Sequence, residues 1–375
     1  MTMAEARLNA AIKAGIRMSH VPLIGTEKGD RAETERVPVG TFALPAGQPT
    51  IISQQLPVGD PWMMMRINLR GDLRDPGVPA TGTVRPDSPL NLWDIALSTD
   101  MDRDVIEPSV SARALYRYNH FLNSVPGLLV AAVLPNTNTT SFQAVIDIPF
   151  VDCLLRIPLD TVLDTRRYNS ITLTITTGTI LSLLNAPAAT TVLENCQADI
   201  EILRVSPRVP LPLTVAKALP FFKRHAAIVP PGDTFINLDR IPTLGIKRIA
   251  AFTSNAAAGT NEPLVGVPFT GIGVNTRIDT MAINSNFRAH FGGIGGGVSF
   301  RTLQAGNMVD YQIAAWPAGW YVADFLLERS LWGALATGDK STLQAVFTYL
   351  GAGANIQQLS LFVAGMQKLR EASGA

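Results

Sequence analysis

Apolar and polar residues alternate along most of the chain beyond residue 34. In "SITLTITTG", Ile171, Leu173 and Ile175 alternate with threonine, and residues 198–205, "ADIEILRV", approximate the same pattern. A period of two is typical of a β-strand with one buried and one exposed face. Loops rich in proline, glycine and asparagine separate these runs, so the pattern predicts an all-β protein. The other candidate strands before residue 206 are residues 35–44, 62–71, 90–97 and 141–150.

The N-terminal segment has a different pattern. Residues 3–18 are rich in alanine, and their apolar residues recur at intervals of four, which predicts a helix. This helix could pack on its own domain or on a neighbour. It could also be a peripheral arm that touches an anionic lipid surface. The apolar stripe consists of Leu8, Ile12 and Ile16, and the positive charges around it are Arg7, Lys13 and Arg17.

A proline-rich stretch divides the chain. Residues 206–220 hold four prolines, which favours an extended link between domains. One further helix is predicted before it, at residues 109–123, but no helices alternate with the strands as a parallel α/β sheet would require. The strand candidates after the link are residues 234–239, 246–254, 309–317, 319–327, 342–351 and 357–365.

Even strand spacing with long loops favours sandwiches of the jelly-roll kind. We therefore expect a double jelly roll, meaning two tandem jelly-roll β-sandwiches, behind an N-terminal helical arm. The expected boundaries are 1–33 for the arm, 34–210 for the first jelly roll and 211–375 for the second.

Composition adds a need for partners. Apolar residues make up 47% of the chain and charged residues 16%, whereas a soluble monomer usually carries about 25% charged residues. So little charge suggests extensive protein–protein contact. The net charge of +1 gives no basic field for nucleic acid, so we expect no direct sequence-specific binding to it. The longest apolar run, "PGLLVAAVLP", is too short for a membrane span, and charges in "MTMAEARLNAAIKAG" argue against a signal peptide.

Residues that could support catalysis or metal binding are sparse. Cys153 and Cys196 have no metal-binding spacing, so we expect free buried thiols and an intracellular origin. Four scattered histidines offer little for a zinc site. Asp199 and Glu201 share one face of a strand, as a glycosidase pair might, but they alternate with isoleucines and are expected to be a solvated face. Residues 221–225, "FFKRH", are expected to form a solvated corner.

The glycine-rich stretch "FGGIGGGVSF", residues 291–300, invites a nucleotide-binding interpretation. A dinucleotide fingerprint requires glycine at its first, third and sixth positions, but Gly293 and Gly295 are followed by Val298. The Gly-Lys-Ser/Thr ending of a phosphate-binding loop is also missing. With no Gly-x-Ser-x-Gly and no His-Glu-x-x-His motif, the sequence predicts no enzyme, no catalytic residue, no cofactor and no metal.

The order of these features resembles the double jelly-roll major capsid proteins of icosahedral, internal-membrane bacteriophages of the tectivirus type, the lineage that includes adenovirus hexon. The resemblance begins with the Ala-rich arm and continues through "SPLNLWDIALSTD" and "SARALYRYNHFLNS". "FQAVIDIPFVD" and "DTRRYNSITLTIT" follow, and "ADIEILRV" ends the first jelly roll. In the second unit, "PAGWYVADFLLER" resembles a strand entered through a Pro-x-Gly turn.

The resemblance implies a structural protein of the virion, assembled in the host cytoplasm, with two upright barrels per chain. It implies homotrimers that form pseudo-hexagonal tiles of a capsid lattice, with minor capsid proteins and internal membrane lipids as further partners. Gly292–Gly297 would then be a surface loop, and the arm would face the lipid. A carbohydrate-acting or amidase-type enzyme and a lectin-like binding module are the alternatives on paired jelly rolls. An aromatic cluster is expected in the second core or the trimer seam: Trp316, Trp320, Tyr321 and Phe325.

Overall fold

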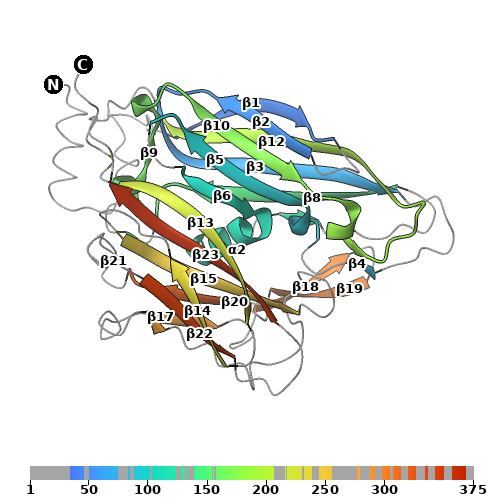
Figure 1. Cartoon of the computed structure of the whole chain (residues 1–375). Helices are drawn as coiled ribbons and strands as arrows, with labels where there is room; N and C mark the ends of the chain where they lie inside the picture. The colour runs from blue at the N-terminus through green and yellow to red at the C-terminus, as the bar shows by residue number, and fades with distance from the viewer. Residues whose placement is uncertain are drawn as a thin grey trace.

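The computed structural model is built almost entirely of antiparallel strands, with one α-helix of 12 residues among the described segments (Figure 1). Its description covers residues 34–45, 50–74, 83–84, 88–101, 104–123, 128–130, 132, 139–153, 155 and 158–206 of the earlier part of the chain. In the later part it covers residues 216, 218–229, 232–238, 245–255, 277–278, 288–291, 298–304, 307–313, 320–326, 334–336, 343–349 and 357–368. The expected helical arm, residues 1–33, lies outside these ranges.

The strands before residue 206 form two facing sheets. One sheet has the order β1-β12-β3-β8, extended by β7, and the other contains β2-β10-β5-β6. This is the arrangement of a jelly roll, in which two four-stranded sheets exchange strands through Greek-key connections. The strands are β1 (Thr34–Ala43), β2 (Thr50–Leu56), β3 (Pro61–Arg74), β5 (Trp93–Thr99), β6 (Ile106–Ser111), β7 (Leu129–Val130), β8 (Thr139–Pro149), β10 (Ile171–Thr177) and β12 (Val192–Val205).

The strands after residue 217 repeat this order. β13-β23-β15-β20 reproduces β1-β12-β3-β8, and β14-β22-β16 reproduces β2-β10-β5. The chain therefore carries the jelly-roll strand order twice. We call the two units roll one and roll two. The strands are β13 (Ala218–Val229), β14 (Gly232–Leu238), β15 (Gly245–Asn255), β16 (Arg277–Ile278), β20 (Trp320–Asp324), β22 (Leu343–Tyr349) and β23 (Gln357–Lys368).

Smaller elements complete the description. The helix α2 (Ala112–Asn123) follows β6, and β17 (Arg288–Phe291) extends the β20 edge of roll two. β18 (Val298–Gln304) and β19 (Asn307–Ile313) form a separate hairpin. The remaining short elements are β4 (Thr83–Val84), β9 (Leu163–Asp164), β11 (Leu184–Asn185), β21 (Leu335–Ala336), η1 (Leu90–Leu92), η2 (Pro158–Thr161), η3 (Thr165–Arg167) and η4 (Ile180–Ser182). No helix in the described segments is long and apolar enough to cross a membrane.

The core of roll one lies between its two sheets, as the alternation predicts. Ile171, Leu173 and Ile175 of β10 are buried, while the threonines between them are partly exposed. Ile200 and Ile202 of β12 face the same interior. The strand predictions for these segments are confirmed. Burying each of these side chains contributes about 1.5–3 kcal/mol relative to leaving it in water.

Three predictions need correction. The helix expected at residues 109–123 starts at Ala112, because Ser111 and Val110 pair with β5 as part of β6. β2 was not predicted. The extended link was expected to reach residue 220, but strand β13 already begins at Ala218. The residues "FFKRH" belong to this strand and do not form a solvated corner. Phe222 is only 1% exposed.

Candidate functional site

The described residues contain no group of three or more His, Cys, Asp or Glu that could hold a metal ion. Three other features stand out: a buried junction between the rolls, a polar network at the start of β1, and the outer face of one sheet.

The junction begins where the sheets of the two rolls meet edge to edge. β6 of roll one pairs in parallel with β13 of roll two through Ile106 and Phe222. The Phe222 amide also donates a hydrogen bond of 2.7 Å to the carbonyl of Val105. Parallel strands need a long connection between them, and here that connection runs through most of roll one. One continuous sheet therefore joins the rolls.

Three aromatic rings fill the space beneath this edge. Tyr118 of α2 meets Phe222 of β13 with ring centroids 5.6 Å apart and Phe362 of β23 at 5.0 Å. Phe222 and Phe362 stack at 5.6 Å with an interplanar angle of 15°. All three rings are almost fully buried, and Phe222 and Phe362 belong to the same hydrophobic cluster as the core of roll one. The outer face of roll two is thus packed against α2 of roll one.

Buried charges cross the same boundary. Asp152, just after β8 of roll one, accepts a hydrogen bond of 2.6 Å from Arg248 Nη1 and lies 3.2 Å from Lys247 Nζ. Arg248 Nη1 also donates to the Tyr118 hydroxyl at 3.1 Å. The three charged side chains are at most 3% exposed. Burial alone would raise the pKa of Asp152, but the charges of Arg248 and Lys247 and their hydrogen bonds hold this pKa far below its usual range.

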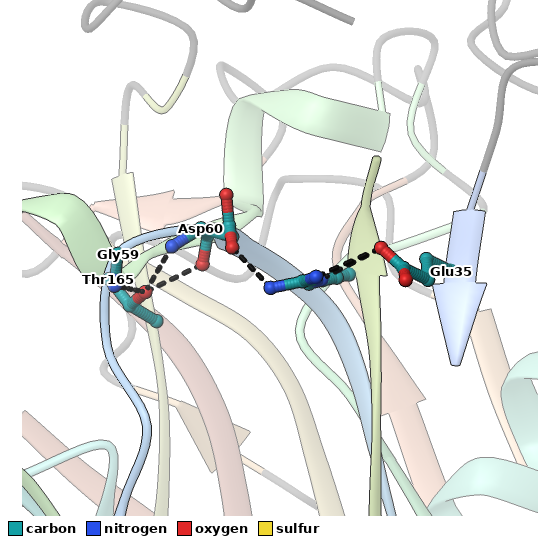
Figure 2. A network of polar contacts seen from close by, with 5 residues as sticks. Glu35, Gly59, Asp60 and Thr165 are labelled. Atoms are coloured by element: carbon teal, nitrogen blue, oxygen red, sulfur yellow. Dashed lines mark hydrogen bonds and ion pairs between the residues drawn. The ribbon is translucent and has the colours of Figure 1, made fainter. Parts of the chain in front are cut away.

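A second network fixes the start of β1 (Figure 2). Arg204 of β12 donates from Nη2 to Glu35 Oε2 at 2.9 Å, and its Nη1 pairs with the carboxylate of Asp60. Figure 2 shows Glu35 and Asp60 reaching toward the same guanidinium from opposite sides. The Thr165 hydroxyl, which is buried, accepts from the amides of Gly59 and Asp60 at 3.0 and 3.1 Å and donates to the Asp60 carbonyl at 2.6 Å. Arg204 therefore holds the first described residues of the chain against the loop before β3.

The outer face of the β1-β12-β3-β8 sheet carries a ladder of charged pairs. Arg66 binds Asp147 through two hydrogen bonds of 2.6 and 2.9 Å, and Arg70 lies 3.3 Å from Asp199. Asp199 and Glu201 are each about one-third exposed, so they form a solvated strand face as predicted. Exposed pairs of this type contribute little, about 0–1 kcal/mol each. Further pairs on this face are Arg36–Glu201 and Arg74–Glu194.

The remaining predicted residues are placed as follows. Neither cysteine forms a disulfide, and only Cys196 is buried, whereas Cys153 is exposed. Burial raises the pKa of Cys196 to about 12. Trp320 and Tyr321 lie in β20, and Phe325 just after it is 7% exposed. Their role in a trimer seam stays a prediction. Outside the described residues lie Gly292–Gly297, Trp316 and the arm residues Arg7, Leu8, Ile12, Lys13, Ile16 and Arg17.

The sequence patterns did not predict this junction. One signal was available. Lys247 and Arg248 stand side by side in "GIKRIAAF", an otherwise apolar strand. Two adjacent cations in such a strand cannot both reach solvent if one face is core, so at least one needs a buried partner.

Comparison with protein-family models and with curated protein sequences finds no match. Solved structures do match. The crystal structure of the STIV MCP aligns with a TM-score of 0.57 and 16% identity, covering 89% of this chain and 96% of that chain. The atomic structure of Sulfolobus Turreted Icosahedral Virus aligns with the same TM-score and 15% identity, covering 89% of this chain and 90% of that chain. The major capsid protein P2 from bacteriophage PM2 aligns with a TM-score of 0.49 and 11% identity. This alignment covers 91% of this chain and 100% of that chain. The first two likenesses show that this chain has the fold of those viral proteins over nearly its whole length.

Proposed function

We propose that this protein is the major capsid protein of an icosahedral virus, and so a component of the virion. The observation that carries the proposal is the jelly-roll order that occurs twice in one chain, β1-β12-β3-β8 and then β13-β23-β15-β20. Its likeness to the Sulfolobus Turreted Icosahedral Virus structure extends over 89% of the chain. Fold alone does not give function. The low charge of the chain adds an independent reason to expect extensive contacts between copies.

The two rolls of each chain act as one rigid block in this proposal. A shell protein transmits load between neighbours, so its two halves must not hinge. The continuous β6–β13 sheet, the Tyr118–Phe222–Phe362 rings and the Asp152–Arg248 pair supply three separate restraints against hinging. We assign residues 34–210 and 211–375 to the two halves of this block.

We further propose that three copies form the tile and that the shell encloses a lipid layer, as in tectivirus-like bacteriophages. The aromatic cluster near residues 316–325 would then lie in the core of roll two or in the seam between copies. Minor capsid proteins would be further partners.

The N-terminal arm is the proposed contact with the inner layer. It precedes Glu35, which Arg204 anchors, so the arm leaves roll one from a fixed point. One arm with a narrow apolar stripe would bind lipid marginally, at about 1 kcal/mol for each basic residue near an anionic surface. Many arms in a lattice would act together through effective concentration.

Negative-stain microscopy of the purified protein tests the proposal. We expect pseudo-hexagonal tiles or closed shells, and a protein that stays monomeric at micromolar concentration would contradict it. Deleting residues 2–20 tests the arm separately. Tiles should form with unchanged melting temperature while membrane-containing shells fail to close. Normal shells from the deleted protein would remove the arm from assembly.

A further inference from the structure

The strand β2 (Thr50–Leu56) ends the long sheet that joins the two rolls. Its only strand partner among the described residues is β10. Its other edge therefore carries backbone amides and carbonyls that β10 does not use, and we call this edge the open edge. The carbonyl of Gln55 accepts an exposed hydrogen bond of 2.9 Å from the side-chain amide of Gln54. One more strand can be added along the open edge.

Edge strands usually carry features that prevent pairing with another chain, and β2 lacks them. Charged residues, prolines and bulges are the common ones. The seven residues "TIISQQL" include no charge and no proline, and they pair with β10 in an unbroken register. Ile51 of this strand is 67% exposed. An uncharged and regular edge with an exposed apolar residue is predicted to pair with another strand.

The strand β1, which ends the other sheet of roll one, shows the contrast. It carries Glu35 and Arg36, and its register with β12 shifts between Pro38 and Gly40. A strand added to β1 would meet these charges, a proline and an interrupted register, whereas a strand added to β2 would meet none of them. Roll one therefore blocks one of its edges against pairing and leaves the other open.

The side chains beside the open edge suit a contact between two identical edges. At a two-fold axis each side chain lies near its own copy, so a charged residue there repels itself. The Ser53 and Thr174 hydroxyls, 3.1 Å apart, can each donate or accept a hydrogen bond, so they can also face copies of themselves. The outward-facing side chains of β2 and of β10 opposite it are all uncharged: Ile51, Ser53 and Gln55, and Thr176, Thr174 and Thr172.

We propose that the open edge of β2 pairs with β2 of a second copy of this chain, antiparallel and about a two-fold axis at Ser53. An axis at Ser53, the middle residue, pairs all seven residues of one strand with all seven of the other. The long sheet then continues from one chain into the next. Within the chain the rolls are already joined edge to edge through β6 and β13, and this contact repeats that mode of joining between chains. The inference rests on the proposed capsid function, in which β2 pairs join neighbouring tiles.

Disulfide cross-linking of Ser53→Cys tests the pairing and its register. Directly opposed residues of antiparallel strands have Cα atoms about 4.5–5.5 Å apart, which a disulfide can span. Assembled protein in a Cys153→Ser background should give dimers linked from residue 53 to residue 53 under a mild oxidant. Ile51→Cys in the same background is the matched control. Position 51 lies opposite position 55 of the other copy, about 13 Å from its own copy, and should not link to itself.

Charge substitution at the axis tests the two-fold relation. Ser53→Lys and Ser53→Glu each place a charge opposite its own copy, and each alone should weaken the joining of tiles about tenfold or more in sedimentation. Because Ser53 is exposed, neither should lower the melting temperature. A one-to-one mixture should restore joining, since lysine then meets glutamate. Val130→Lys is the control, because Val130 is 42% exposed on β7, an end strand of the other sheet, and it should leave joining unchanged.

The outcomes separate this inference from the proposed function. Tiles of Ser53→Lys that form normally but do not join into shells support the pairing. If Ser53→Lys and Ser53→Glu each build shells like the unaltered protein, or if residue 53 links to another segment and not to its own copy, the pairing is wrong while the capsid function stands. If Ser53→Lys prevents the tiles themselves, β2 lies inside a tile and the assignment is overturned. If the unaltered protein forms neither tiles nor pairs linked at residue 53, both fail together.

Discussion

Asp152→Asn is the sharpest test of the junction between the rolls. Asparagine has nearly the same shape as aspartate, so the substitution removes a charge without opening a cavity. It removes the carboxylate that contacts both Lys247 and Arg248, whose side chains are 3% and 0% exposed. Removing one partner of a buried ion pair typically costs about 3–5 kcal/mol. We expect a loss of stability in that range.

Equilibrium unfolding in urea, followed by tryptophan fluorescence and circular dichroism, measures this loss. Glu194→Gln is the control, because its partner Arg74 is 49% exposed and a surface pair contributes about 0–1 kcal/mol. Since Asp152 belongs to roll one and both cations belong to roll two, the variant should also unfold in two steps, with the rolls uncoupled. A loss no larger than that of Glu194→Gln, in a single transition, would refute the reasoning.

Replacing the whole charged group gives a second measurement of the same cluster. Buried ion pairs are often exchanged for apolar residues of similar volume at little cost. Asp152→Leu combined with Lys247→Met and Arg248→Met should therefore recover most of the stability lost in Asp152→Asn. If this triple variant is as unstable as the single one, the damage comes from packing and not from unpaired charge.

Three further outcomes follow from the structure. The folded-state pKa of Asp152 lies below the unfolded value of about 3.9. The contribution of its charge to folding stability is therefore complete above about pH 5 and is lost as the pH falls toward the folded pKa. The stability difference between wild type and Asp152→Asn should stay constant from about pH 8 to about pH 5 and shrink below about pH 4. Gly71→Ala would bring a methyl group within 2.7 Å of the Phe142 ring and 2.9 Å of Cys196 Sγ, and it should cost about 1–3 kcal/mol in thermal melting; an unchanged melting temperature would contradict this. Trp320→Ala should destabilise the fold or the trimer by about 3–5 kcal/mol, and if neither the melting temperature nor the trimer yield changes, the placement of this aromatic in a core or seam is wrong.

Strands that face solvent on one side were the predictable part of the fold. In β10 and β12 one face meets the core of roll one and the other meets water, so apolar and polar residues alternate cleanly. β2 was missed because it is an edge strand. Its sequence "TIISQQL" places an exposed Ile51 beside a half-buried Ile52, and the period of two is lost.

The start of β13 was missed for the opposite reason. Here the outer face of the strand is also covered, since Phe222 packs on roll one. A strand buried on both faces loses its alternation. Because of its proline and its basic residues, the segment was interpreted as a link followed by a solvated corner. The contact between Asp152 and Arg248 spans 96 residues of chain, and no local pattern predicts a partner at that distance.

The internal repeat shows which structural features the sequence alone does not predict. Backbone features recur in both rolls, as the bulges at Met63 and Lys247 do, because strand order and register fix them. Side chains at equivalent positions do not recur, and Arg36 corresponds to Phe222. The difference follows from what each face meets. Phe222 is buried by the chain's own first roll, so it must be apolar in the isolated molecule. Arg36 lies on the outer face of the roll-one sheet, where its side chain is 60% exposed, so a charged residue is favoured there. Divergence between equivalent positions therefore follows from how far the chain itself covers each face, and no local sequence pattern encodes that coverage.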